Sequence, residues 1–315
     1  MQIRGKATKV VNTKISGNDL VTYYLGYDID DVGEMKYRLA EFVKLIINLI
    51  PEFAFGHHQG LETPNDELVG KLSEAAKAIY KIKEFKEIGD LYLNGEYLDD
   101  EIEIDKKYLK RGEFGELILH FLLKNFHNTI PLISKVYFKD SFGHAVHGFD
   151  SVHINEVDQT LWLGESKLYT DGKKGLTALI EDMNEHFNRD YLNDEFTIIS
   201  NRVKDSNYKE GKSEYWLNLL DSSTKLSEQL KHIVVPLICT YSCTIFDKYS
   251  DEEDEKFLEE YEREILNLKK HFDEKYNHPF KERLKVVVIL FPVQSKNELV
   301  KALHKKLILM QKLGE

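Results

Sequence analysis

The stretch TLWLGESKLY, residues 160–169, is the part of the sequence from which the fold can best be read. It is rich in apolar and aromatic side chains and has the length of a buried strand. Successive side chains of a strand point to opposite faces. Leu161, Leu163, Glu165 and Lys167 therefore share one face, and Ser166 points away from them. A carboxylate and an amine thus project side by side from the end of an apolar strand.

A second strand, FDSVHIN at 149–155, immediately precedes this one. The short acidic link NEVDQ joins the two, which predicts a hairpin. Within the first strand, Asp150 shares a face with Val152 and Ile154. If the strands pair as a hairpin, Asp150 lies near Glu165 at one edge of the sheet.

Outward from the hairpin, helical and strand patterns alternate along the chain. Apolar residues at helical spacing predict helices over 35–50, 68–85, 112–126, 173–189, 214–230, 253–272 and 297–313, and β-branched runs predict strands over 21–29, 131–139, 232–241 and 284–292. We expect Pro51 to end the first of these helices. The order predicts an α/β fold in which a mixed sheet is flanked by helices.

The acidic, turn-rich stretch 87–106 is the best candidate for a domain boundary. It separates a smaller α/β N-terminal region, residues 1–105, from a main domain, residues 106–315. Residues 1–105 hold 12 Lys and Arg against 20 Asp and Glu, whereas residues 106–315 hold 31 against 34. The net charge of −11 therefore arises mainly in the N-terminal region, and a local basic groove in the main domain stays compatible with it.

Targeting signals and disulfides are not expected in this chain. The basic N-terminus precedes no apolar run, and the longest apolar stretches are too short to span a bilayer. The two cysteines, Cys239 and Cys243, lack partners for a zinc site and fit buried apolar positions in a reducing compartment. We therefore expect a cytoplasmic protein that does not associate with a membrane.

The convergence of Asp150, Glu165 and Lys167 suits a hard divalent cation, Mg²⁺ or Mn²⁺. Such ions bind carboxylate and carbonyl oxygens, so the two carboxylates and the backbone carbonyl of Ser166 are candidate ligands. Lys167 would orient a water or stabilise charge on a phosphate. A lone Glu-x-Lys is common on exposed strand ends and surface helices. The prediction therefore depends on the ordered set of a helix glutamate, Glu116, then the aspartate, then Glu-x-Lys.

The segments GELILHFLL, HGFDSVHI and LWLGESKLY, in this order, resemble the nuclease subunit, HamA, of Hachiman anti-phage defence systems. The resemblance is clearest over residues 106–240 and implies a PD-(D/E)xK, or restriction-endonuclease-like, fold. It implies that Asp150 and Glu165 bind metal, that Lys167 is catalytic and that Glu116 is the helix carboxylate. HGFD lacks the proline of the superfamily's "PD", as many members do.

The resemblance also implies a function and partners. It implies a DNA nuclease of anti-phage defence that is restrained by a superfamily-2 helicase subunit, HamB. The chain contains no GxxxxGK[ST] motif, so an ATP-driven step would belong to a partner. Two alternatives stay open. One is a non-catalytic regulatory or nucleic-acid-binding subunit of a helicase complex, and the other is an RNA substrate.

Three further residues are weaker candidates for contacts with DNA. Lys173 and Lys174 open the helix that follows the Glu-x-Lys strand, where backbone N–H groups favour anions. His147 lies in the turn FGHAVHG just before Asp150. For the lysines, the competing interpretation is a solvated first turn.

Overall fold

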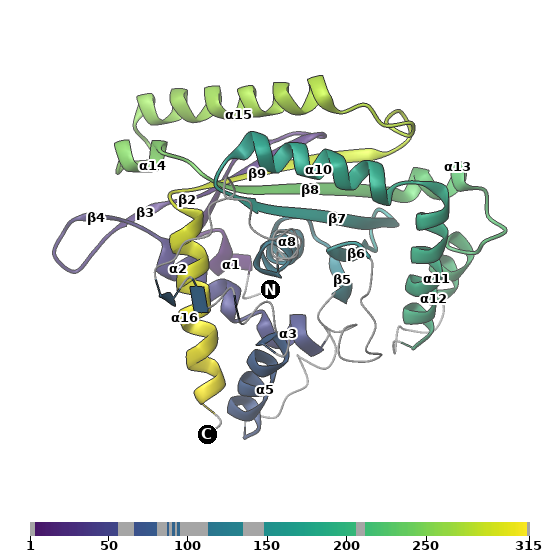
Figure 1. Ribbon diagram of the computed structural model, residues 1–315, viewed down its shortest axis with the longest axis horizontal. Coiled ribbons are helices and arrows are strands. Elements are labelled where there is room, and N and C mark those ends of the chain that lie inside the picture. Colours follow the sequence, from purple (N-terminus) through teal and green to yellow (C-terminus); the bar gives the residue numbers. More distant parts are fainter. Residues whose placement is uncertain are drawn as a thin grey trace.

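A mixed β-sheet organises the molecule (Figure 1). The computed structural model describes residues 4–55, 66–80, 87, 90, 91, 93, 94, 113–134, 148–205 and 212–313. Within these residues the sheet has seven strands in the order β1-β2-β9-β8-β7-β6-β5. The four central strands, β2, β9, β8 and β7, are parallel to one another, and antiparallel strands flank them on both sides. The predicted α/β fold with a mixed sheet is confirmed.

The strands follow the apolar runs of the sequence. Those of the main sheet are β1 (Val11–Ser16), β2 (Leu20–Leu25), β5 (Ile130–Ser134), β6 (Ser151–Asn155), β7 (Thr160–Tyr169), β8 (Ile233–Ser242) and β9 (Lys285–Val293). A separate two-stranded hairpin consists of β3 (Tyr27–Ile29) and β4 (Met35–Tyr37). Strands β8 and β9 are buried along almost their whole length, as expected of parallel strands covered on both faces.

Helices cover both faces of the sheet (Figure 1). One face packs against α1 (Arg4–Ala7), α2 (Leu39–Ile47), α3 (Ile50–Phe55), α5 (Leu68–Tyr80), α8 (Glu113–Phe126) and α16 (Lys296–Lys312). The other packs against α10 (Gly172–His186), α11 (Arg189–Asp205), α12 (Lys212–Leu219), α14 (Ile245–Lys248) and α15 (Glu255–Lys275). The short helix α13 (Leu226–Gln229) and the 3₁₀ turn η1 (Leu230–His232) lead into β8.

Several predicted elements differ from the structure at their ends. The expected helix 35–50 begins as strand β4, and its helical part ends at Ile47. Pro51 does not end a helix but lies in the first turn of α3, where a missing N–H costs no hydrogen bond. The expected helix 214–230 is divided into α12 and α13 by a turn that begins at Asp221, whose carboxylate accepts from the N–H of Ser223.

The N-terminal region contributes strands and contacts to the same sheet. β2 lies parallel to β9, so strands from residues 1–105 and 106–315 hydrogen-bond to one another. Glu52 on α3 also forms an ion pair with Lys124 on α8. The boundary proposed from the sequence falls mainly within 95–112, outside the described residues, and stays a prediction.

A histidine in the core predicts how stability depends on pH. His304 on α16 is fully buried and packs edge-on against Phe114, and burial lowers its pKa to about 4. The pKa of this ring is near 6.5 in the unfolded chain, so the unfolded chain takes up a proton there at a higher pH than the folded protein. The folded state therefore has its full stability only above pH 6.5, where the ring is neutral in both states. The contribution of the neutral ring, at most about 3 kcal/mol, is lost as the pH falls from 6.5 towards 4.

We therefore expect urea unfolding to give a smaller free energy of unfolding at pH 4.5 than at pH 7. In His304→Leu this pH dependence should be reduced by about 2 kcal/mol or more. Met310→Leu, at a buried apolar position of the same helix, is the control and should keep the dependence of the wild type. Equal pH dependence in wild type and His304→Leu would contradict the assignment.

Candidate active site

The β6–β7 hairpin places Asp150 directly opposite Glu165. The two strands are antiparallel, and their last pair is Ser151 with Gly164. Continuing this register by one residue brings Asp150, which precedes β6, level with Glu165 of β7. β7 then continues to Tyr169, paired with β8 on its other side. The predicted hairpin is confirmed, and it leaves the end of β7 beyond Gly164 unpaired with β6.

The tight link between the strands explains their register. The side-chain oxygen of Asn155 accepts hydrogen bonds from the N–H groups of Val157 and Asp158, which closes an Asx turn. Gln159 completes the reversal with a positive φ of 51°. This acidic link therefore acts as a turn that fixes the register of the strands.

The Asp150 carboxylate is anchored to the part of β7 that lies beyond its pairing with β6. Its Oδ2 accepts from the backbone N–H of Ser166 at 2.8 Å and from the Ser166 hydroxyl at 2.7 Å. In a strand, the N–H and C=O of one residue point to the same side. The Ser166 carbonyl therefore points to the side on which Asp150 lies. One carboxylate oxygen from Asp150, one from Glu165 and this carbonyl oxygen can converge there.

Helix α10 covers the face of β7 that carries Glu165 and Lys167 (Figure 1). Nδ1 of His186 lies 2.7 Å from Oε1 of Glu165, and Asp182 forms an ion pair with Lys167. The helix thus runs antiparallel to the strand. Two strand residues span about 6.6 Å and four helix residues about 6 Å, so both pairs fit at once.

Aromatic rings hold His186 in place. Its ring stacks on Tyr191 with centroids 4.7 Å apart and meets the edge of Phe149 at 6.3 Å. Phe149 also packs against Phe187, so this face of the sheet is closed next to Glu165. Glu165 itself is only 1% exposed. His186 therefore orients a buried carboxylate.

Lys167 is surrounded by carboxylates. Burial alone would lower its pKa, but Asp182, Asp150 and Glu165 together outweigh burial and raise the pKa above its ordinary value. The amine is therefore a stable cation across physiological pH. It is suited to stabilise negative charge and unsuited to act as a general base.

Glu116 lies on the opposite face of the sheet, on α8. A Cβ at Gly115 would lie 3.1 Å from the Ser166 hydroxyl, so the helix approaches β7 closely. Nδ1 of His120 lies 3.1 Å from Nε2 of His153 on β6. Glu116 lies one helical turn before His120, so the rises of a helix and a strand place its backbone near the level of Ser151 on β6. Its side chain is only 4% exposed. Its part in the site remains a prediction.

Asp182 and His186 were not among the residues singled out from the sequence. Their four-residue spacing on the helix after the Glu-x-Lys strand is the signal that could have indicated them. It matches the two-residue spacing of Glu165 and Lys167, but only if the helix packs antiparallel over that strand. The sequence alone does not contain that packing direction.

The weaker DNA-binding candidates lie apart from this cluster or outside the described residues. Lys173 and Lys174 are exposed in the first turn of α10, about two turns from Asp182. Lys173 faces α15. Burial lowers the pKa of His271 there, with smaller contributions from Lys275 and Lys173, and burial raises the pKa of Glu264 while the charge of Lys173 opposes that rise. His147 falls within 135–147, which the structure does not describe. All three remain predictions.

The oxygen donors fit a small hard cation. Mg²⁺ typically takes one or two carboxylates and keeps several waters. Asp150, Glu165 and the Ser166 carbonyl match that requirement. Within the described residues, no group of three or more His, Cys, Asp or Glu side chains gathers as a preformed cage.

The fold is consistent with the α/β nuclease-like class, and the β6–β7 hairpin brings an Asp, a Glu and a Lys close together. A model of the HamA family matches residues 6–307, and the chain belongs to that family. Membership makes it a component of Hachiman anti-phage defence. A search of curated proteins gave no match. None of the helices in the described ranges is long and apolar enough to cross a bilayer.

Proposed function

We propose that this protein is a metal-dependent DNA nuclease that hydrolyses phosphodiester bonds in Hachiman defence under the control of a partner helicase. The observation that carries the proposal is the placement of Asp150 opposite Glu165, with the Lys167 cation beside them. Two carboxylates and a lysine held close together are the groups that would supply metal ligands and a cation for phosphodiester hydrolysis. The lack of an ATPase motif supports the assignment of any helicase step to a partner.

Each residue has a distinct part in this proposal. Asp150, Glu165 and the Ser166 carbonyl would hold Mg²⁺ or Mn²⁺, and Glu116 would add a carboxylate from the other side. A bound ion lowers the pKa of a coordinated water and neutralises charge on the scissile phosphate. The Lys167 ammonium stabilises charge that develops on the phosphate oxygens, and His186 keeps Glu165 oriented.

Replacement of Lys167 by alanine tests the proposal directly. With Mg²⁺, wild type should degrade plasmid DNA, and Lys167→Ala should lose about a hundredfold or more in rate. Lys269→Ala is the matched control, because Lys269 is also a partly buried, ion-paired lysine, but on α15. If Lys167→Ala cuts as fast as wild type, the assignment is wrong.

Asp182 is a positioning residue in this scheme, because it touches Lys167 and not the substrate. Asp182→Ala should lower kcat by about tenfold to a hundredfold and leave KM for DNA nearly unchanged. Asp182→Glu should recover most of the lost rate, since it restores the charge beside Lys167. A loss that Asp182→Glu does not recover, together with a lower melting temperature, would instead indicate a structural role.

The same contacts support a second candidate, a regulatory or nucleic-acid-binding subunit. Glu165 and Lys167 are both engaged by α10, so the cluster could serve only to hold the helix on the sheet. DNA or partner binding without cleavage, with Mg²⁺ or Mn²⁺ and with or without the partner, would favour it. Parallel assays on RNA and DNA decide the substrate.

A further inference from the structure

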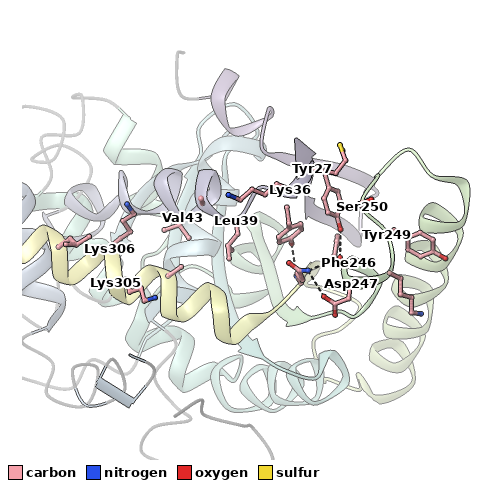
Figure 2. A pocket seen from close by; sticks show the side chains of 17 residues that line it. Tyr27, Lys36, Leu39, Val43, Phe246, Asp247, Tyr249, Ser250, Lys305 and Lys306 are labelled. Atoms are coloured by element: carbon pink, nitrogen blue, oxygen red, sulfur yellow. Dashed lines mark hydrogen bonds between the residues drawn. The ribbon is translucent and has the colours of Figure 1, made fainter. Parts of the chain in front are cut away.

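An elongated groove lies away from the candidate active site, between the β3–β4 hairpin, α2, α14 and α16 (Figure 2). Its volume is about 970 Å³. None of the residues assigned to the active site lines it. The two regions can therefore be altered independently.

The floor of the groove is a packed aromatic cluster. Tyr37 lies between Tyr27 and Phe246, with ring centroids 5.5 and 5.3 Å away. The Tyr27 hydroxyl donates to the Phe246 carbonyl at 3.1 Å, and the Tyr37 hydroxyl accepts from the N–H of Gln294 at 3.2 Å. These rings are already packed and hydrogen-bonded within the chain. They form a preformed floor and are poorly placed to stack on bases.

Aliphatic side chains line the walls. Leu39 and Val43 of α2 lie in the groove, as Figure 2 shows. At its margins Met35 is 44% exposed and Leu309 is 58% exposed. Ile29 pairs with Met35 across the β3–β4 hairpin and is 67% exposed, so it extends the apolar margin of the groove. Exposed apolar side chains gathered at the margin of a groove are typical of surfaces that bind another molecule.

The charges around the groove are mostly positive, although the whole chain carries −11. Lys36 comes from the hairpin, and Lys305 and Lys306 lie together on α16 (Figure 2). Lys248 also lines the groove, but it forms an ion pair with Glu260 at 2.9 Å. Asp247 is the single carboxylate among the described lining residues. The rim therefore favours a ligand with negative charge.

We propose that this groove binds an acidic, amphipathic segment of the second protein of the Hachiman system. Such a segment places apolar side chains between α2 and α16 and carboxylates against Lys36, Lys305 and Lys306. This is the mode in which an amphipathic helix occupies a groove. The aliphatic walls and the packed aromatic floor favour a protein segment over nucleic acid. The inference rests on the partner named in the proposed function and is independent of the nuclease chemistry.

The test measures binding of the purified second subunit to the full chain by titration calorimetry. Lys305→Glu combined with Lys306→Glu, and separately Leu309→Asp, should each weaken binding by about tenfold or more. The controls, at positions of α15 that do not line the groove, are Leu266→Asp and Lys270→Glu, at an exposed leucine and an exposed lysine. Both controls should bind within about twofold of wild type.

A photocrosslinking residue in place of Leu309 adds a direct readout. In the assembled complex it should crosslink to a partner peptide that contains both carboxylates and apolar residues, whereas the same residue in place of Leu266 should not. Unchanged affinity of the groove variants, no affinity of wild type for the subunit, or a crosslink to DNA would each overturn the inference. Lys167→Ala should bind the subunit with the affinity of the wild type. A failed nuclease assay would therefore not change the interpretation of the binding measurement.

Discussion

Glu165→Gln should reduce Mg²⁺-dependent DNA cleavage by about a thousandfold or more. The substitution removes the negative charge of a candidate metal ligand with almost no change in shape. An amide can still hydrogen-bond with His186, which lies 2.7 Å from Oε1 in the native chain. The packing of α10 on β7 is thereby kept, and the loss should arise from weakened metal binding.

Two measurements separate this cause from loss of folding. Titration calorimetry with Mn²⁺ should show binding to wild type and much weaker binding to Glu165→Gln, and thermal unfolding should be similar for both. Glu264→Gln is the matched control, since Glu264 is a half-buried carboxylate on α15, next to the start of α10 and outside the cluster. Wild-type cleavage by Glu165→Gln would remove Glu165 from the mechanism.

The part of the site that lies on the hairpin could be predicted from the sequence because its geometry is local. Alternation along 160–169 puts Glu165 and Lys167 on one face, and the short link predicts the antiparallel pairing that sets Asp150 opposite Glu165. Both inferences use only the two-residue period of a strand. They need no knowledge of distant segments.

The contributions of the neighbouring helices could not be predicted in the same way. The ion pair of Asp182 with Lys167 depends on the direction in which α10 crosses β7, a property of tertiary packing. Helix α11, which holds Tyr191 against His186, has a weakly apolar, polar-rich sequence and was not expected. The helix start at Ile50 likewise depends on packing, because Pro51 by itself suits either the end or the first turn of a helix.

Asp150→Asn should also abolish cleavage, with a loss of about a thousandfold or more. The Asp150 carboxylate both accepts hydrogen bonds from Ser166 and supplies negative charge as a candidate metal ligand. This variant keeps the first role and removes the second. An asparagine oxygen can still accept from the N–H and hydroxyl of Ser166, so the edge of β7 stays ordered. What disappears is the negative charge next to Lys167, together with a metal ligand.

Ser166→Ala provides the complementary change. It removes the hydroxyl that donates to Asp150 at 2.7 Å but keeps the backbone N–H donor and the carbonyl. Activity should fall by no more than about tenfold, the effect of one lost hydrogen bond behind a ligand. Asp158→Asn, at an aspartate in the turn of the same hairpin, should cut at the wild-type rate. If Ser166→Ala were as damaging as Asp150→Asn, Asp150 would act mainly by ordering the strand edge, and the metal would have to be held by other residues.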